Sequence, residues 1–189
     1  MMSDVPFPAP VESLLMIQPV RMPPALPVMF ALLLAACAGG PPPAVTAAAP
    51  RFVAERLFAG HLDGTGTLKV VLHAPSRTHV TSIGHVTADG VLVLDQHIEQ
   101  QGSPARDRQW RIRPMPNGRY TGTLTDASGP VAGETEGNRL HLSFPMPGSM
   151  HVDQWLTLSS DGQVAQNHMI VRKLGVRVAV LEETIRKLP

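Results

Sequence analysis

A single cysteine offers the most specific chemistry in this chain. Cys37 ends an apolar run over residues 27–36, and Leu34-Ala35-Ala36-Cys37 has the branched, small, small, cysteine order of a bacterial lipobox. In that motif the thiol becomes a thioether that carries diacylglycerol. The alternative, a buried cysteine at the end of a core helix, is disfavoured because the glycines and prolines of residues 39–43 cannot continue a helix. We therefore expect Cys37 to be a lipid attachment site.

The apolar run before Cys37 divides the chain into a leader, a tether and a domain. It is too short to span a bilayer, which takes about 20 residues, but it fits the apolar region of a secretory signal. We expect a signal peptide over residues 1–36, with Met16 as an alternative start. A lipidated cysteine and flexible linker over residues 37–50 and a domain over residues 51–189 follow. This organisation predicts a lipid-anchored protein of the bacterial cell envelope. Because Ala38 rather than an aspartate follows Cys37, we expect the anchor to lie in the outer membrane, with the protein facing the periplasm.

Three aspartates in the expected domain are spaced widely enough to lie on different strands, namely Asp95, Asp126 and Asp153. They could form an acid–base set, but we favour the simpler interpretation that they cap turns or pair with arginines. The large aromatic residues Trp110, Tyr120 and Trp155 either line a ligand cavity or fill a core. Small barrels do one or the other, so both interpretations stay open.

Composition argues against several classes of function. The net charge of +1 is too small to indicate a nucleic-acid partner. The eight histidines show no tight ligand spacing, and we expect no metal site. A lone cysteine leaves no internal disulfide. The chain has no Gly-x-Ser-x-Gly and no phosphate-binding loop, so we assign no catalytic residue and expect no cofactor.

The elements that must position these residues are strands. Apolar and polar residues alternate with the period of a half-buried strand over residues 67–72, 91–100, 108–114, 118–126, 138–144 and 176–180. Turn-forming segments such as Asp89-Gly90 and Asn117-Gly118 separate these runs. Residues 51–60 are the one candidate for a short helix. We predict an all-β domain, a single antiparallel up-and-down β-barrel of nine or ten strands, because closure removes the unpaired sheet edges.

The stretch around Asp153 departs from simple alternation. Asp153 and Trp155 share one face, and the other face carries Val152, Gln154, Leu156 and Leu158. A tryptophan that stays exposed to solvent buries little of its large apolar surface. We therefore expect the face that carries Asp153 and Trp155 to point inward. A buried Asp153 then needs a partner, and an arginine or the hydroxyl of Tyr120 would serve.

The order of motifs over residues 57–187 resembles the bacterial lipoprotein family catalogued as domain of unknown function 3833. The most specific segments are residues 120–129, Gly137-Asn138, Asp153 to Trp155 and Lys173-Leu174-Gly175. The resemblance implies a calycin-like barrel, related in shape to lipocalins, on a lipoprotein anchor, and it implies no activity. It adds Asn138 and Lys173 to the aspartates and aromatics as candidates for a ligand pocket or a structural polar site. Gln96 and Gln154 stand where the family has acids, which removes a carboxylate from both positions.

Three functions fit these observations. The barrel could bind a lipid or another apolar small molecule, it could be a lipid-modifying enzyme that uses buried carboxylates, or it could be a structural or assembly factor of the outer membrane. We favour the first by elimination and by analogy of fold. We expect a monomer whose partners are the membrane, through the N-terminal lipid anchor, and a lipid or fatty-acyl ligand.

Replacing Cys37 by serine removes the thiol on which lipidation depends. We expect Cys37→Ser to stay uncleaved or mislocalised and to lose labelling by a radioactive fatty acid, because serine cannot form the thioether. Labelling, gel mobility and membrane fractionation measure the outcome. Ala38→Ser, which keeps the thiol, should remain labelled. Fatty-acid label on Cys37→Ser at mature size would contradict the lipobox assignment.

Overall fold

The computed structural model describes residues 50–189. Cys37 and the expected boundary between leader and tether lie outside these residues, so the signal peptide, the lipid anchor and most of the linker stay predictions.

The described chain is built almost entirely of strands. A five-residue helix comes first, α2 (Ala54–Phe58), and a short 3-10 turn, η1 (Pro116–Gly118), lies between two strands. The strands are β1 (Gly60–Val70), β2 (Ser76–Val86), β3 (Leu92–Gln100), β4 (Arg106–Met115), β5 (Arg119–Leu124), β6 (Val131–Glu136), β7 (Arg139–Met146), β8 (Met150–Leu158), β9 (Val164–Lys173) and β10 (Val176–Lys187). The helix within residues 51–60 agrees with the sequence-based expectation.

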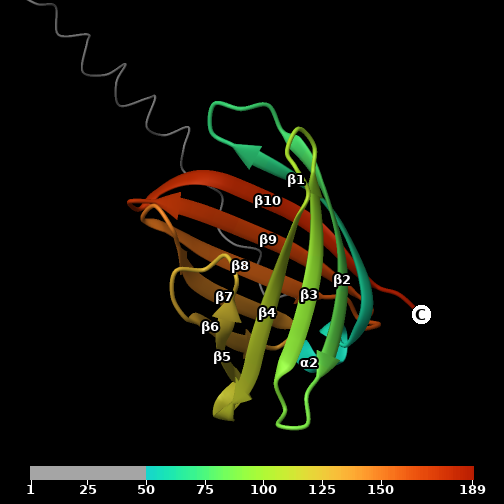
Figure 1. Ribbon diagram of the computed structural model, residues 1–189. Helices are drawn as coiled ribbons and strands as arrows, with labels where there is room; N and C mark the ends of the chain where they lie inside the picture. The colour runs from blue at the N-terminus through green and yellow to red at the C-terminus, as the bar shows by residue number, and fades with distance from the viewer. Residues whose placement is uncertain (1–49) are drawn as a thin grey trace, which may run out of the picture. The chain divides into compact units, whose positions relative to one another are not determined.

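The strands form one closed antiparallel barrel. Each strand pairs with its neighbours in the chain, and β1 pairs with β10 from Leu62↔Lys187 to Val70↔Ala179, which closes the sheet. Strands β2 to β4 cross in front of β7 to β10, so the barrel is flattened into two layers (Figure 1). The predicted all-β up-and-down barrel is therefore confirmed, with ten strands.

Alternation along the strands separates an apolar interior from a polar exterior. On β7, Leu140, Leu142 and Phe144 are buried, and the residues between them are only half-buried. The half-buried strand expected over residues 67–72 is confirmed only in part. The strand ends at Val70, and Leu72 lies in the following turn with its side chain exposed.

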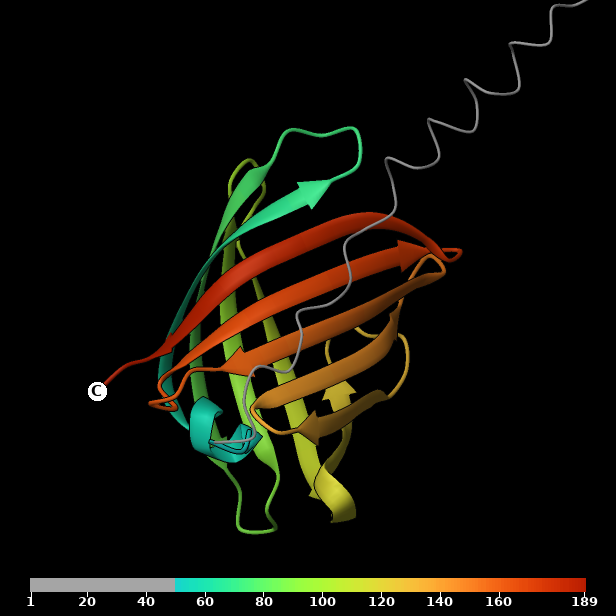
Figure 2. The same ribbon diagram turned by 180° about the vertical axis from the view of Figure 1, so that it is seen from behind.

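The barrel has two different ends. Because consecutive strands are antiparallel, the turns β1–β2, β3–β4, β5–β6, β7–β8 and β9–β10 gather at one end, which we call the mouth. The other turns gather at the opposite end, and α2 packs there against β2 and β3 (Figure 2). Phe52, Leu57 and Phe58 are buried, and the Phe52 amide donates a hydrogen bond to the Gly137 carbonyl in the β6–β7 turn. This second end is therefore closed by apolar side chains.

Gly84 on β2 allows the helix to pack this closely. A Cβ atom at position 84 would lie 1.9 Å from the Phe58 carbonyl oxygen, which is a backbone atom that cannot rotate away. Only glycine therefore admits α2 at its observed place against β2.

We expect Gly84→Ala to lower the free energy of unfolding by about 1–3 kcal/mol, the usual range for overpacking, because α2 must shift away from β2. Urea denaturation followed by circular dichroism measures the change. His85→Ala on the same strand changes an exposed side chain and serves as the control. Equal stability of the two variants would show that α2 does not depend on this contact.

Candidate functional site

Polar side chains gather inside the barrel, where the register places them on the inward face with the apolar core. We call this set the interior polar cluster, and it consists of Thr78, Ser82, Gln96, Arg108, Asn167 and Glu183. Thr78, Ser82, Asn167 and Glu183 are almost fully buried. Buried polar and charged groups lower stability unless they are hydrogen-bonded, so a cluster at this depth calls for an explanation of its own.

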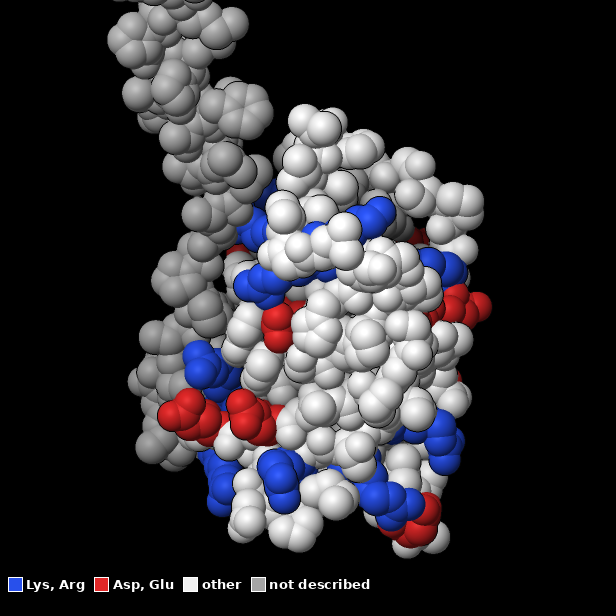
Figure 3. All heavy atoms as spheres, turned by 90° about the vertical axis from the view of Figure 1, so that its left-hand side faces the viewer, with Lys and Arg blue, Asp and Glu red and all other residues white. Residues whose placement is uncertain are grey.

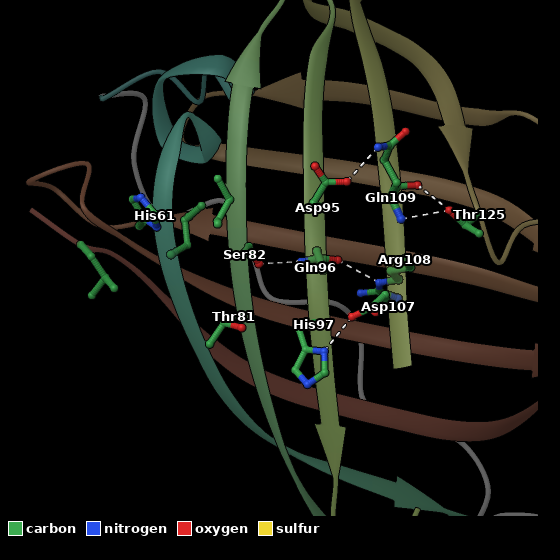
Figure 4. Close-up of a pocket in the computed structure, with 13 residues that line it drawn as sticks. His61, Thr81, Ser82, Asp95, Gln96, His97, Asp107, Arg108, Gln109 and Thr125 are labelled. Atoms are coloured by element: carbon green, nitrogen blue, oxygen red, sulfur yellow. Dashed lines mark hydrogen bonds and ion pairs between the residues drawn. The ribbon is translucent and has the colours of Figure 1, made fainter. Parts of the chain in front are cut away.

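Gln96 is the hub of the β2–β4 side of the cluster. Its amide nitrogen donates to Ser82 Oγ over 3.1 Å, and its amide oxygen accepts from Arg108 Nε over 2.8 Å (Figure 4). The same oxygen accepts from the indole nitrogen of Trp110 over 2.7 Å. A carboxylate here could accept these bonds but could not donate to Ser82 without a proton, so the amide suits a site that needs both.

Arg108 keeps most of its hydrogen-bonding capacity unused. Its Cζ lies 5.4 Å from the centre of the Trp110 ring, and burial lowers the pKa of the guanidinium to about 10. Within residues 50–189, the two terminal nitrogens of Arg108 make no hydrogen bond to the protein. The interior therefore holds a cation with free donors, which is the arrangement that recognises an anion or a carbonyl.

Glu183 on β10 faces this cation across the interior. It is 8% exposed, and Asn167 Nδ2 donates to its Oε2 over 2.8 Å. Burial raises the pKa of this carboxyl, and the bond from Asn167 and the charge of Arg108 oppose that rise only in part. Glu183 is thus held closer to its protonated form than an exposed glutamate.

Glycines on β1 make room for the Glu183 side chain. A Cβ at Gly64 would lie 2.7 Å from Glu183 Oε1, and one at Gly66 would lie 2.9 Å from Glu183 Cβ and 3.0 Å from Thr78 Oγ1. In the β1–β10 register, Gly66 pairs with Glu183 and Gly64 pairs with Ile185. A larger residue at either glycine position would displace the Glu183 carboxyl group, so these two positions of β1 require glycine.

The interior is filled on the side of the cluster that faces the closed end, and its wall is partly exposed on the side that faces the mouth. A cavity of about 30 Å³ lies between Arg108, Trp110, Gln154 and Glu183, which is room for a water molecule or two at ~10–15 Å³ each. Among residues 50–189, Thr78 Oγ1 and Asn167 Oδ1 have no hydrogen-bond partner. Toward the mouth, the inward-facing wall is apolar and only half-buried, and it is formed by Leu68, Met169, Val171 and Leu181.

The sequence-predicted aromatic residues separate into three places. Trp110 is buried at the cluster and packs edge-on against Phe144 with ring centres 5.4 Å apart. The Tyr120 hydroxyl accepts from the Ala54 amide over 3.3 Å and donates to Glu55 over 3.3 Å, so it fastens α2 to the closed end. Burial raises the pKa of Tyr120. Trp155 lies on the outer face.

Asp153 and Trp155 point outward, so the inward orientation expected for them is wrong. Asp153 accepts from Arg172 over 2.6 Å and from His141 over 3.1 Å, which does supply the expected arginine partner. The Trp155 ring stacks on His141 with centres 4.8 Å apart and lies 6.1 Å from His168. Two histidine rings on adjacent strands thus cover the tryptophan outside the barrel, a source of burial that the expectation overlooked.

The remaining candidates are scattered. Asp95 lies on the outer face of β3, where it accepts from Gln109 over 2.8 Å beside a surface pocket of about 670 Å³ (Figure 4). Asp126 pairs with Arg106 at the mouth. Asn138 is buried in the β6–β7 turn and donates to the Leu158 carbonyl over 2.9 Å. Lys173 is exposed at the end of β9. The three aspartates therefore do not meet as an acid–base set.

Sequence reasoning missed the most deeply buried charged residue. Glu183 and Asn167 stand at inward positions of β10 and β9. Had the alternation been followed beyond residue 180, it would have placed Glu183 on the same face of the strand as Leu181 and Ile185. Gly64 and Gly66, two residues apart on the facing strand, were the second signal. Within residues 50–189, no group of three or more histidine, cysteine, aspartate or glutamate residues is placed to hold a metal ion. No helix described in that range is long enough to cross a bilayer.

Glu183→Gln tests the buried carboxyl through its pH dependence. A carboxyl whose pKa is raised by folding contributes most below its ordinary value of 4.5, and that contribution is lost as the pH rises through the folded value. Glutamine has no such loss and can still accept from Asn167. We expect the variant to melt at a higher temperature than the wild type at pH 8, with the difference shrinking toward pH 4.

Differential scanning fluorimetry between pH 4 and pH 8 measures this difference, with exposed Glu134→Gln as the control that should show no such trend. A variant that is less stable than the wild type at pH 8 would show that the charge of Glu183, rather than its burial, dominates.

Comparison with known proteins agrees with this architecture. The solved structures include an S-type phycobiliprotein lyase, CpeS from Guillardia theta, with a TM-score of 0.57 at 5% identity over 69% of this chain and 88% of that one. They also include a protein of unknown function from the DUF3598 family of Nostoc punctiforme, with a TM-score of 0.56 at 11% identity over 75% of this chain and 51% of that one.

These likenesses support a calycin-like fold, as expected from the sequence. Among curated proteins, none matches the chain. The family model described as protein of unknown function (DUF3833) matches residues 31–187, which is most of the chain. The chain therefore belongs to the DUF3833 family.

Proposed function

We propose that the barrel binds an amphipathic small molecule of the lipid class, with an anionic head at the interior polar cluster and an apolar tail toward the mouth. The proposal rests on the guanidinium of Arg108, whose two terminal nitrogens have no hydrogen-bond partner within residues 50–189, and on the apolar, half-buried wall between it and the mouth. Binding sites of this kind combine an apolar lining with a few placed polar groups.

The charge state of the cluster favours an anionic head. Arg108 stays cationic at neutral pH because its pKa of about 10 remains well above 7. Two carboxylates act on Arg108, namely Glu183 and Asp126. Asp126 is already paired with Arg106, and burial raises the pKa of Glu183 and so weakens its competition for the guanidinium. A ligand carboxylate or phosphate could therefore accept two hydrogen bonds from the guanidinium fork, while Thr78 and Asn167 offer further polar atoms nearby.

The tail would lie against β1, β9 and β10. Leu68, Met169 and Leu181 adjoin one another through the register of these strands, and all three are half-buried. Burial of such side chains by an acyl chain stabilises the complex by about 25 cal/mol per Å² of apolar surface removed from water. The wall therefore provides affinity, and Arg108 provides orientation.

The acid–base alternative loses its support because Asp95, Asp126 and Asp153 do not meet, and each is bound to a different partner on the outer face or at the mouth. The phycobiliprotein lyase among the structural neighbours is an enzyme by its name, yet at 5% identity it informs only the fold. We infer a binding protein rather than a catalyst.

The lipobox supports the setting of this activity. We propose that Cys37 carries the lipid anchor, that the linker tethers the barrel to the outer membrane from the periplasmic side, and that the protein acts as a monomer. A barrel tethered in this way meets its lipid ligand at the surface to which it is attached.

Binding of cis-parinaric acid, a fluorescent fatty acid, tests the proposal. We expect Arg108→Gln to weaken binding about 10-fold or more, because a charge-assisted hydrogen bond contributes about 1.5–3 kcal/mol. Arg111→Gln changes an exposed arginine on the outward face of the same strand and should bind like the wild type. Circular dichroism and thermal melting verify that both variants are folded.

Native mass spectrometry of the protein extracted from its own membrane should then identify the natural ligand. Equal affinity of Arg108→Gln and wild type for the fatty acid would contradict the head-group assignment. No binding by either protein would contradict the proposed function itself.

A further inference from the structure

Two leucines at the mouth are exposed to an unusual degree. Leu72 in the β1–β2 turn is 98% exposed, and Leu174 in the β9–β10 turn is 80% exposed. Val71 and Val176 beside them are also exposed. The two turns lie at the same end of neighbouring strands, and the Val71 amide donates to the Val178 carbonyl over 2.9 Å. Four apolar side chains therefore project from one side of the mouth.

The backbone at both leucines makes the choice of residue more telling. Leu72 has φ 65° and Leu174 has φ 50°, in the left-handed region where leucine is uncommon. Glycine would adopt this conformation without strain. Each position thus carries a side chain that is unfavourable both for the turn and for solvation, which indicates that the side chain serves a purpose outside the fold.

The charges around these turns have one sign. Within the turns of residues 71–75 and 174–175 and three residues on either side, the chain holds basic residues and no aspartate or glutamate. The basic residues are Lys69, Arg77, Arg172, Lys173 and Arg177. Arg172 is paired with Asp153, and the other four make no ion pair within residues 50–189. Figure 3 shows an uncharged projection at the top of the molecule and a band of basic side chains beneath it.

The closed end lacks this arrangement. Its β2–β3 and β8–β9 turns carry Asp89 and Asp161, and α2 carries Glu55 beside Arg56. Exposed leucines with nearby cations are the combination that enters the interface of an anionic bilayer, since apolar groups insert and cations meet the lipid phosphates. The two ends of the barrel thus differ in the surface that each can meet.

We propose that the mouth docks on the surface of an anionic lipid bilayer, with Leu72 and Leu174 inserted among the lipids and the neighbouring lysines and arginines at the head groups. This contact is additional to the anchor at Cys37, and it turns the mouth toward the membrane. It does not depend on the interior polar cluster, so it stands or falls separately from ligand binding.

Single tryptophans report insertion directly. Full-length protein with Leu72→Trp or Leu174→Trp is mixed with vesicles of phosphatidylglycerol and brominated phosphatidylcholine, and the wild-type signal of Trp110 and Trp155 is subtracted. We expect quenching and a blue shift at both positions. Ile83→Trp is the matched control, since Ile83 is 55% exposed on the outer face of β2 and should stay unquenched. Because all variants share the same N-terminal segment, that segment cannot produce a difference between them.

Glycine substitutions separate the membrane contact from folding. We expect the pair Leu72→Gly and Leu174→Gly to lower vesicle affinity about tenfold or more, because two inserted leucines are lost. The melting temperature should stay the same or rise, because glycine relieves the positive φ at both turns. Binding should also weaken in high salt and on vesicles of phosphatidylcholine alone.

Three results would overturn the proposal. The first is quenching at Ile83→Trp equal to that at the mouth, and the second is unchanged vesicle affinity of the glycine pair. The third is a dimer in solution, seen by light scattering, that the glycine pair dissociates, which would make a second copy of this chain the partner of the mouth.

Discussion

The pairing of β1 with β10 is the constraint on which the rest of the structure depends. It closes the sheet, so that no strand between residues 60 and 187 is left at an open edge. It sets Gly64 and Gly66 against Glu183 and so allows a carboxyl group into the interior. Through Val71 and Val178 it also brings the two leucine-bearing turns to one side of the mouth. The closure of the barrel, the interior polar cluster and the exposed leucines at the mouth therefore all depend on one strand pair.

The interior polar cluster lowers stability where an all-apolar core would have raised it. Asn167 donates one hydrogen bond to Glu183, and Gln96 accepts one from Arg108. In the described part of the chain, three sets of polar atoms have no partner, namely Thr78 Oγ1, Asn167 Oδ1 and the two terminal nitrogens of Arg108. Partly satisfied buried networks are unfavourable, and proteins retain them mainly at functional sites. The closed end, filled by α2 and the Tyr120 contacts, supplies the packing that compensates.

The sequence predicted the barrel because alternation is a local signal that strands keep wherever one face is buried. It did not predict the site, because the partners come from strands distant in the chain. Arg108 meets Gln96 only through the β3–β4 register, and Glu183 meets Gly64 only through closure. The outward orientation of the Trp155 side chain likewise depends on His141 and His168, which lie on two other strands. Residue 72 continued the predicted alternation, but the strand ended before it.

The end of β1, just before Leu72, is where the mouth meets the interior of the barrel. On β1, Val70, Leu68 and Gly66 share the inward face, so an apolar track leads from the end of the strand, next to the turn that carries Leu72, down to the level of Glu183. At about 3.3 Å per residue the part of this track that lies on β1 is roughly 13 Å long. A mouth docked on a bilayer meets head groups first, and Arg108 lies at the far end of the track as the cation that would draw an anionic head inward. The tail then follows along Leu68 and Val70 without crossing water, and its end remains near Leu72 at the lipid surface. An amphipathic ligand with a long chain fits this path, whereas a short one would leave the apolar track uncovered.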